Sequence, residues 1–262
     1  MTALISFGVS SSMFYTNRTH LTKHYRKGAR KEFCVTHSTN NPWEWGNAEN
    51  NKDFLRRGAN ASAHVVVDDK ERWQVADYSW SISAVGGRAW RGFEPKPWLK
   101  DRIKNANSIS WEMCLGWNRD NTAIIERTAA DIGFVLVSQG LEIGAVVRHH
   151  DAVGKYCPFF GQLYMSPAEW TAFYKNPSGS GFWSQADEDA IFFKFKLRCE
   201  YWRLYHAKRL GKISEADYKA ALSKKAMQAF VCDKDFKLRP WSWPEYPIKG
   251  IERSFNQAPA EK

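Results

Sequence analysis

Short apolar segments with the pattern of β-strands alternate with helical segments through the first 176 residues, and this order limits the fold more than any other feature. The strand-like segments are Phe33–Thr36, His64–Val67, Ile109–Leu115 and Ala145–Arg148. Helices that alternate with strands along a chain cover a sheet and bury its faces. We therefore predict an α/β fold, with a central mixed β-sheet flanked by helices.

Helical patterns fill the intervals at residues 48–57, 122–139 and 167–175. Gly58 and Gly140 follow the first two of these segments, and glycine commonly follows the last turn of a helix. In the segment 122–139, apolar residues recur every three or four positions, as they do on a helix with one buried face. These helices supply the outer layers of the predicted fold.

The sequence Asn-Pro-Ser-Gly-Ser-Gly at residues 176–181 is the clearest linker signal in the chain. We therefore predict a first domain at residues 1–176, a linker at residues 177–181, and a small helical C-terminal module at residues 182–262. The strand-like segments all lie in the first domain, so we expect any chemistry of the sheet to lie there as well.

Two helices are expected in the C-terminal module, at residues 184–210 and 214–230, and Gly211 separates them. The longer one has a largely aromatic stripe, which we expect to form the core of the hairpin; its members are Ile191, Phe195, Cys199, Trp202 and His206. From Cys232 onward the chain is rich in proline and tryptophan, and we expect it to be irregular.

The chain has a net charge of +10 at pH 7, which favours an anionic partner. Candidate partners of this kind are nucleic acid, an anionic membrane and the anionic polymers of a cell wall. Lys and Arg are spread along the whole chain without a run of five or more like charges, which is unlike a nucleic-acid-binding arm. We expect a diffuse positive surface and no nucleic-acid partner, although the charge alone does not choose among the candidates.

The cysteines and the N-terminus bear on where the protein is made. Five cysteines at wide spacings, with no CxxC pair, are a poor match to a disulfide framework or a four-cysteine zinc site. The first residues, MTALISFGVSSSMFYT, lack the basic region of a signal peptide. No stretch reaches the ~20 apolar residues that a membrane span needs. We expect synthesis in the cytoplasm, with no signal peptide and no membrane span.

Polar residues interrupt or end strands that otherwise have the composition of a core: His37, Glu112 and the run from His149 to Cys157. A carboxylate inside a buried strand is costly unless another group pairs with it. Imidazole and thiolate are preferred ligands of Zn²⁺, and a catalytic zinc site uses three protein ligands. The spacing of eight residues from His149 to Cys157 suits a strand-end ligand and a loop ligand; the neighbouring His150, which also fits a surface position, stays open as the alternative ligand.

Four segments, in order, resemble the zinc-dependent N-acetylmuramoyl-L-alanine amidases, a family that includes phage endolysins and peptidoglycan recognition proteins. The segments are Cys34–Thr39, Ala61–Asp69, Asn107–Cys114 and Arg148–Pro158. The last one is the most specific, because it has the His, Lys, Cys and Pro of the family at the expected offsets. The resemblance spans roughly residues 30–175 and does not reach the C-terminal segment.

The resemblance implies that His37, His149 and Cys157 are the ligands of Zn²⁺. It likewise implies that Glu112 is the general base and that Lys155 stabilises the oxyanion. The implied reaction is hydrolysis of the amide bond that joins N-acetylmuramic acid to L-alanine in peptidoglycan. Together with the absence of a signal peptide, the implied lifestyle is that of an endolysin, which acts on the cell wall after release.

Substrate contacts are implied for Asn107, His64 and Trp80. Taken by its residues alone, His64 fits a structural role at least as well. The sequence departs from the family pattern at Ala63, where an aromatic residue is common, and at Trp80-Ser-Ile-Ser, where Trp-His-Ala-Gly is familiar. These departures concern the wall that would contact the substrate, not the predicted metal ligands.

Two other functions remain open at the level of sequence. A peptidoglycan-binding module that has kept the fold without cutting is the main alternative, although Cys157 and Glu112 argue against it. A regulator that binds nucleic acid or a polymerase would use the positive charge, and its binding would depend steeply on salt. The segment 182–262 could bind the wall, form a dimer or restrain the active site.

Overall fold

The computed structural model describes residues 17–18, 25–27, 30–57, 62–86, 94–175 and 185–243 of the 262-residue chain. The predicted linker at 177–181, the N-terminal sixteen residues and the tail after residue 243 lie outside the described residues, as does Gly58. Within the described part the fold is α/β, as predicted, with a mixed sheet flanked by helices.

The main sheet has six strands in the order β1-β5-β4-β7-β3-β8. Their bounds are β1 Asn17–Arg18, β3 Phe33–Ser38, β4 Val65–Val67, β5 Arg72–Gln74, β7 Ser108–Met113 and β8 Val146–Arg148. The strands β4, β7, β3 and β8 run parallel to one another, whereas β5 runs antiparallel to β4. A second, two-stranded sheet pairs β2 (Tyr25–Lys27) with β6 (Trp80–Ile82). The sequence did not predict β1, β2, β5 or β6, which are two or three residues long and, unlike β4 with its three valines, have no run of apolar residues.

Side-chain alternation along β7 separates the two faces of the sheet, as the sequence predicted. Ile109, Trp111 and Met113 belong to the large core on one face. Glu112 faces the other way and is paired in register with His37 of β3. Both polar side chains therefore leave the sheet on the side away from the large core.

The helices have these bounds: α1 Ala48–Arg56, α2 Asn121–Gln139, α3 His149–Val153, α4 Pro167–Lys175, α5 Gln185–Arg209, α6 Glu215–Leu222 and α7 Lys225–Phe230. Short 3-10 turns lie at η2 (Ile143–Ala145) and η3 (Phe160–Tyr164). The predicted ends of α1, α2 and α5 are correct to within one residue. Among the described residues, no helix has both the length and the apolar character that crossing a membrane requires.

The helix predicted at 214–230 is wrong in one respect, because it is two helices, α6 and α7. Lys224 between them has an extended ψ of 137°. Leu222 and Met227 are both buried in the same core. Side chains five residues apart point in different directions on a continuous helix. The break allows both of them to reach that core.

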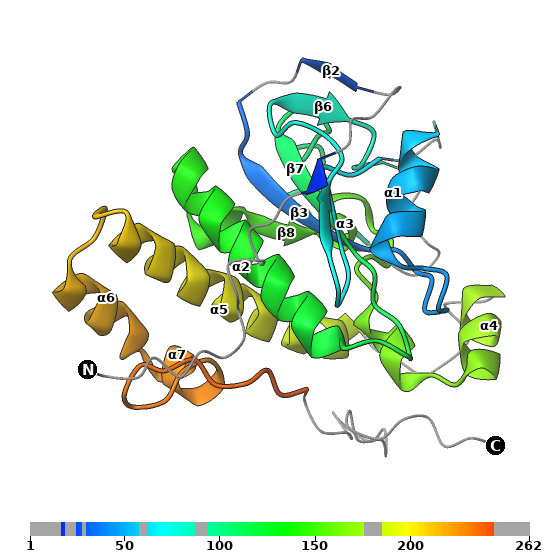
Figure 1. The fold of residues 1–262 in the computed structure, drawn as a ribbon. Coiled ribbons are helices and arrows are strands. Elements are labelled where there is room, and N and C mark those ends of the chain that lie inside the picture. The colour runs from blue at the N-terminus through cyan, green and yellow to red at the C-terminus, as the bar shows by residue number, and fades with distance from the viewer. Residues whose placement is uncertain are drawn as a thin grey trace.

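The long helix α5 packs against α2, which in turn lies on the sheet (Figure 1). The sequence predicted that the aromatic stripe of this helix forms the core of a C-terminal hairpin alone. The structure shows a wider role for the stripe residues Ile191, Phe195, Cys199 and Trp202. They share one hydrophobic core with α2 and with the strands. The division at 177–181 stays a prediction, but α5 is in contact with the α/β part of the molecule.

The helices α2 and α5 approach each other closely at Gly133. A Cβ atom at Gly133 would lie 2.6 Å from the Cβ of Trp202 and 2.7 Å from the backbone nitrogen of Arg203. Both atoms belong to the rigid part of α5, so the helices would have to separate to admit a methyl group. The absence of a side chain at Gly133 is therefore a requirement of helix packing.

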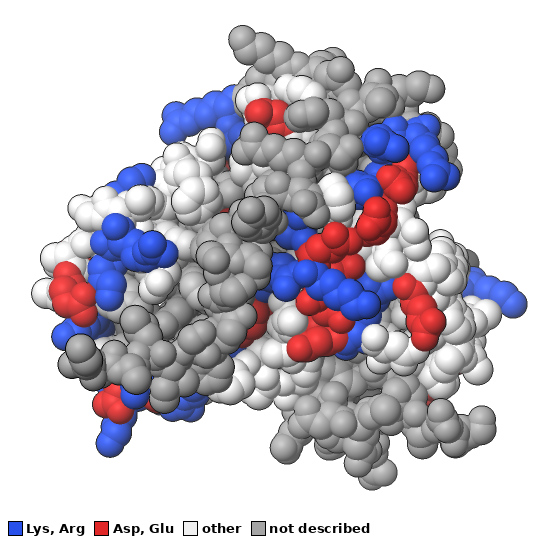
Figure 2. Space-filling model, viewed as in Figure 1, with Lys and Arg blue, Asp and Glu red and all other residues white. Residues whose placement is uncertain are grey.

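Charged side chains of both signs are mixed on the face that Figure 2 shows. Lys and Arg are interspersed with Asp and Glu over this face, without one large basic patch among the described residues. The net charge of +10 is therefore diffuse on this face, as the sequence suggested.

We expect Gly133→Ala to lower the free energy of unfolding by about 1–3 kcal/mol, because the added methyl overpacks the contact between α2 and α5. Urea denaturation followed by circular dichroism would measure this change. Gly144→Ala is the matched control, since a Cβ at Gly144 meets nothing within 4 Å. Equal stabilities of the two variants would show that the helices do not meet closely at Gly133.

Candidate metal centre

A cavity of about 670 Å³ opens on the face of the sheet that carries His37 and Glu112. His37 is the fifth of the six residues of β3, and Glu112 lies opposite it on β7. The cavity is also lined by His149, Lys155 and Cys157. The structure thus brings together all five residues that the sequence predicted for metal binding and catalysis.

His37, His149 and Cys157 form the one group with a metal-binding arrangement among the described residues. One potential ligand atom from each lies within 4.8 Å of the others, and all three side chains are buried. The Sγ of Cys157 is 3.7 Å from Nδ1 of His37. The rings of His37 and His149 have their centroids 4.6 Å apart. Three soft or borderline ligands at this separation suit a small divalent cation such as Zn²⁺.

The two imidazoles are held in the neutral form that a metal requires. Burial is the main cause that lowers the pKa of His37 well below its usual value. Burial and the charge of Lys155 lower the pKa of His149 to about 4. Near neutral pH each ring therefore keeps a lone pair available.

The surroundings of His149 favour one of its nitrogens as a ligand. Its Nε2 lies 2.9 Å from the carbonyl oxygen of Gly86, to which it can donate a hydrogen bond, and 3.2 Å from the backbone nitrogen of the same residue. Its Nδ1 is buried and has no hydrogen-bond partner among the described residues. A histidine that donates one N–H to a carbonyl and offers its other nitrogen is the usual arrangement beside a metal.

Two further polar atoms of the cavity, on His37 and Glu112, also lack a counterpart. Nε2 of His37 and Oε2 of Glu112 are buried without a hydrogen-bond partner among the described residues. Burial raises the pKa of the Cys157 thiol, and nearby Glu112 raises it further. Unsatisfied donors and acceptors of this kind are costly unless a ligand or ion completes them. The donor set therefore fits a bound cation, which would also stabilise the thiolate.

Glu112 has the environment of a proton-transfer group. Its Oε1 lies 3.8 Å from Nδ1 of His37. Burial raises the pKa of the Glu112 carboxyl to about 7, although the charge of Lys155 acts in the opposite direction. A carboxyl group with a pKa near neutrality can both accept and return a proton. Lys155 lines the same cavity and is the cation that lies nearest in sequence to Cys157.

The structure does not bring the predicted substrate residues to the cavity. His64 is fully buried, where Nδ1 accepts a hydrogen bond from the Ser110 N–H and Nε2 contacts the carbonyl oxygen of Trp80. The Trp80 carbonyl also accepts a hydrogen bond from Lys31. His64 and Trp80 thus tie the two sheets together, which agrees with the structural alternative for His64.

Asn107 lies at the opposite end of β7 from Glu112. Its side chain accepts a hydrogen bond from the N–H of Lys104 and donates to the carbonyl of Arg102 and to Glu32. These bonds fix the turn that leads into β7. Asn107 does not line the cavity around His37, so its predicted substrate contact is not supported by its position.

His150 is buried, which corrects the expectation of a surface position. Its ring stands edge-on to that of Tyr156, with centroids 6.2 Å apart. His150 is not part of the group formed by His37, His149 and Cys157. The structure places its neighbour His149 at the first position of α3, where the chain turns from β8 toward the cavity.

Two exposed aromatic residues on the cavity wall were missed. Phe54 of α1 and Tyr174 of α4 each have about 60% of their surface exposed and line the cavity. Exposed aromatic rings at a cavity mouth offer flat apolar faces to a ligand. The available signal was the pair Phe54-Leu55 on the mostly polar helix at residues 48–57, since adjacent residues of a helix do not face the same way.

Comparison with known proteins found matches among solved structures, whereas no protein-family model and no curated protein matches the chain. PlyL is 21% identical, with 63% of this chain and 98% of PlyL covered and a TM-score of 0.45. The catalytic domain of PlyG is 18% identical, with 71% and 95% covered and a TM-score of 0.49. The N-acetylmuramoyl-L-alanine amidase LysC from Clostridium intestinale URNW is 14% identical, with 54% and 88% covered and a TM-score of 0.34.

The buried His64 makes stability depend on pH in a defined direction. Burial is the main cause that lowers its pKa to about 3. As the pH falls, His64 therefore binds a proton near pH 6.5 in the unfolded chain but only near pH 3 in the folded protein. We expect this residue to cost the folded state about 1.4 kcal/mol for each pH unit below 6.5.

Urea unfolding of wild type and His64→Gln, from pH 7 to pH 4.5 with a chelator present, measures this contribution. The variant should be less stable at pH 7, and its deficit should shrink as the pH falls. The difference between the two curves cancels the effects of the other buried histidines. Parallel curves would show that His64 is not buried in its neutral form.

Proposed function

We propose that this chain is a zinc-dependent amide hydrolase that cuts peptidoglycan between N-acetylmuramic acid and L-alanine. The observation that supports it best is the convergence of His37, His149 and Cys157 with Glu112 and Lys155 in one cavity. The substrate is inferred from the sequence, where these residues occur in segments that resemble the N-acetylmuramoyl-L-alanine amidases. The enzyme would act on the cell wall, as an endolysin does.

His37, His149 and Cys157 would hold the zinc ion. When bound, the ion would supply Lewis acidity, which polarises an amide carbonyl and makes a water molecule more acidic. The buried thiol and the unpartnered imidazole nitrogens are the features of this chain that favour such an ion.

Glu112 would take a proton from the attacking water and return it to the departing L-alanine nitrogen. A carboxylate in the same cavity as the predicted metal ligands lies close enough to the site for both halves of this transfer. The Oε1 of Glu112 lies near the ring of His37, and the thiol of Cys157 contacts the same ring.

Lys155 would stabilise the negative charge that develops on the amide oxygen. It is two residues before Cys157, so the loop that brings the thiol to the cavity also brings the ammonium group. Preorganised positive charge at this place lowers the barrier more than it favours the uncharged substrate.

The wall itself would be a second partner. The net charge of +10 would attract anionic wall polymers over distances of about a Debye length. Exposed Phe54 and Tyr174 would contact the sugar or peptide at the cavity mouth. A peptidoglycan-binding protein without hydrolytic activity would share these features, and the experiments below distinguish it.

Wall digestion by the purified protein is expected to require zinc and Cys157. We expect release of stem peptides with a free L-alanine amine, seen by mass spectrometry, from the zinc-loaded wild type. Chelation should abolish the release and added zinc should restore it, whereas Cys157→Ser should lose both tight zinc binding and activity. A folded, zinc-loaded protein that releases nothing from several wall types would instead be a recognition protein.

Glu112→Gln should separate chemistry from metal binding. The amide side chain keeps the size of the carboxylate but cannot accept the proton, so we expect kcat to fall by roughly 10²–10⁴-fold. Zinc content, measured by atomic emission, should remain close to one ion per chain. Full activity of Glu112→Gln would remove Glu112 from the mechanism without affecting the assignment of the metal ligands.

A further inference from the structure

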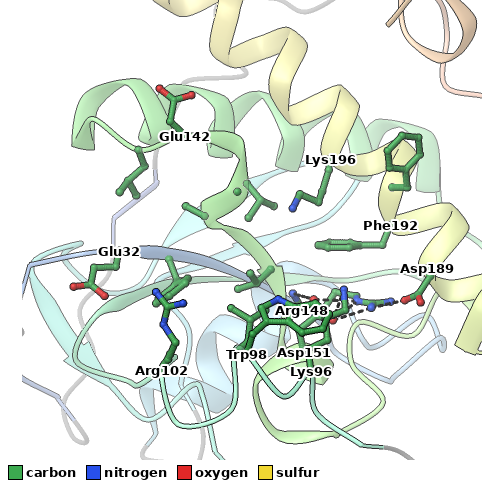
Figure 3. A pocket seen from close by; sticks show the side chains of 18 of the residues that line it. Glu32, Lys96, Trp98, Arg102, Glu142, Arg148, Asp151, Asp189, Phe192 and Lys196 are labelled. Carbon is green, nitrogen blue, oxygen red and sulfur yellow. Dashed lines mark hydrogen bonds and ion pairs between the residues drawn. The ribbon is translucent and has the colours of Figure 1, made fainter. Parts of the chain in front are cut away.

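Arg148, the residue before His149, is a buried cation with an unusual set of partners. Its side chain is about 1% exposed and lines a second cavity of about 820 Å³, on the α5 side of β8 (Figure 3). A guanidinium group removed from water must be paired to be tolerated. The partners of Arg148 therefore determine where the chain runs immediately before His149.

The first partner, Asp151, is local. Its carboxylate accepts a hydrogen bond from the Arg148 N–H at 2.9 Å and another from Nη2 of the Arg148 side chain at 2.8 Å. Lys96 approaches the same carboxylate at 3.2 Å. Burial alone would raise the pKa of Asp151, but the ion pair with Arg148 lowers it. This ion pair fixes the turn between β8 and α3, at which His149 stands.

The second partner, Asp189, is distant in sequence and belongs to the first turns of α5. Nη2 of Arg148 donates a hydrogen bond to its Oδ1. One helical turn further on, the ring of Phe192 lies under the guanidinium, 4.9 Å from its central carbon. Figure 3 shows Arg148 held between Asp151 and Asp189, with Phe192 projecting from α5 beside it. The segment that leads to His149 is thereby attached to α5.

Glu188, the neighbour of Asp189, binds the chain segment that follows Cys157. Its Oε1 accepts a hydrogen bond of 2.9 Å from the Gly161 N–H. Gly161 is four residues after Cys157, in the turn η3. Glu188 itself is about 2% exposed, so this bond lies in the interior. Two consecutive carboxylates of α5 thus reach the two chain segments that carry His149 and Cys157.

We propose that the start of α5 is a positioning element of the metal centre, in which Asp189, through Arg148, and Glu188, through Gly161, set the relative placement of His149 and Cys157. The inference rests on the proposed function only in taking His37, His149 and Cys157 as metal ligands. Among the roles that the sequence left open for residues 182–262, this proposal favours a restraint on the active site and assigns it to the start of α5. Neither carboxylate lines the cavity that contains the predicted metal ligands.

The expected size of the effect follows from the distance between Asp189 and the metal ligands. Residues that contact a ligand directly change metal affinity by about 10–100-fold when they are replaced. Asp189 acts through one further residue, and Asp151 would still pair with Arg148 in its absence. We therefore expect Asp189→Asn to weaken zinc binding by about 3–10-fold, mainly through faster release.

The experiment measures zinc affinity of the full-length chain by competition with a chelator, and thermal unfolding of the metal-free protein in parallel. The variants are Asp189→Asn, which removes the charge, and Asp189→Glu, which restores it. Asp189 is 48% exposed, so both substitutions are compatible with folding. Glu200→Gln is the matched control: it breaks the ion pair of Glu200 with Arg203, with contacts of 2.6 and 2.8 Å, on the same helix.

The proposal predicts that zinc binding is weaker in Asp189→Asn, recovers in Asp189→Glu and is unchanged in Glu200→Gln. It also predicts that Asp189→Asn and Glu200→Gln have equal stabilities in the metal-free form. Activity lost by Asp189→Asn should then return at saturating zinc. Equal zinc affinities of wild type and Asp189→Asn would overturn the positioning role while leaving the proposed function intact. A wild type that binds no zinc would overturn both.

Discussion

The parallel pairing of β3 with β7 in one register is the constraint on which the cavity depends. It places His37 opposite Glu112 on the face away from the large core. A shift of one residue would turn either side chain toward the largely apolar core under α2. Backbone hydrogen bonds and the apolar residues on either side of Glu112 hold this register. The polar cavity is therefore supported by interactions that do not involve its own side chains.

Burial then gives the cavity its electrostatic character. The same exclusion of water lowers the pKa values of His37 and His149 and raises those of Glu112 and Cys157. Every one of these groups is shifted toward its uncharged form. A cation in their midst would reverse the preference of the thiol and the carboxyl group, while leaving the imidazoles neutral. The charge on the Cys157 thiol and on the Glu112 carboxyl group therefore depends on whether a cation is bound.

Sequence alone could predict the elements with strong periodicity and the residues in specific motifs. The strands β3 and β7 alternate clearly, and the five residues predicted for metal binding and catalysis meet in one cavity. Alternation tells which face a side chain takes but not what covers that face, so His64 and Trp80 could not be placed between the sheets. The exposure of Phe54 and Tyr174 depends on tertiary contacts. The attachment of Arg148 to α5 joins residues forty-one positions apart and has no local signal.

The close contact at Gly133 bears on how this protein can be divided or recombined. The apolar side of α2 that faces α5 would be open to water in any fragment that stops before residue 185, and such a surface promotes aggregation. A fragment or fusion that keeps this core closed would also have to retain α6 and α7, because Leu222 and Met227 are buried in the same core as α5. The natural unit for engineering is therefore longer than the motif-bearing segment, because one hydrophobic core joins that segment to α5, α6 and α7.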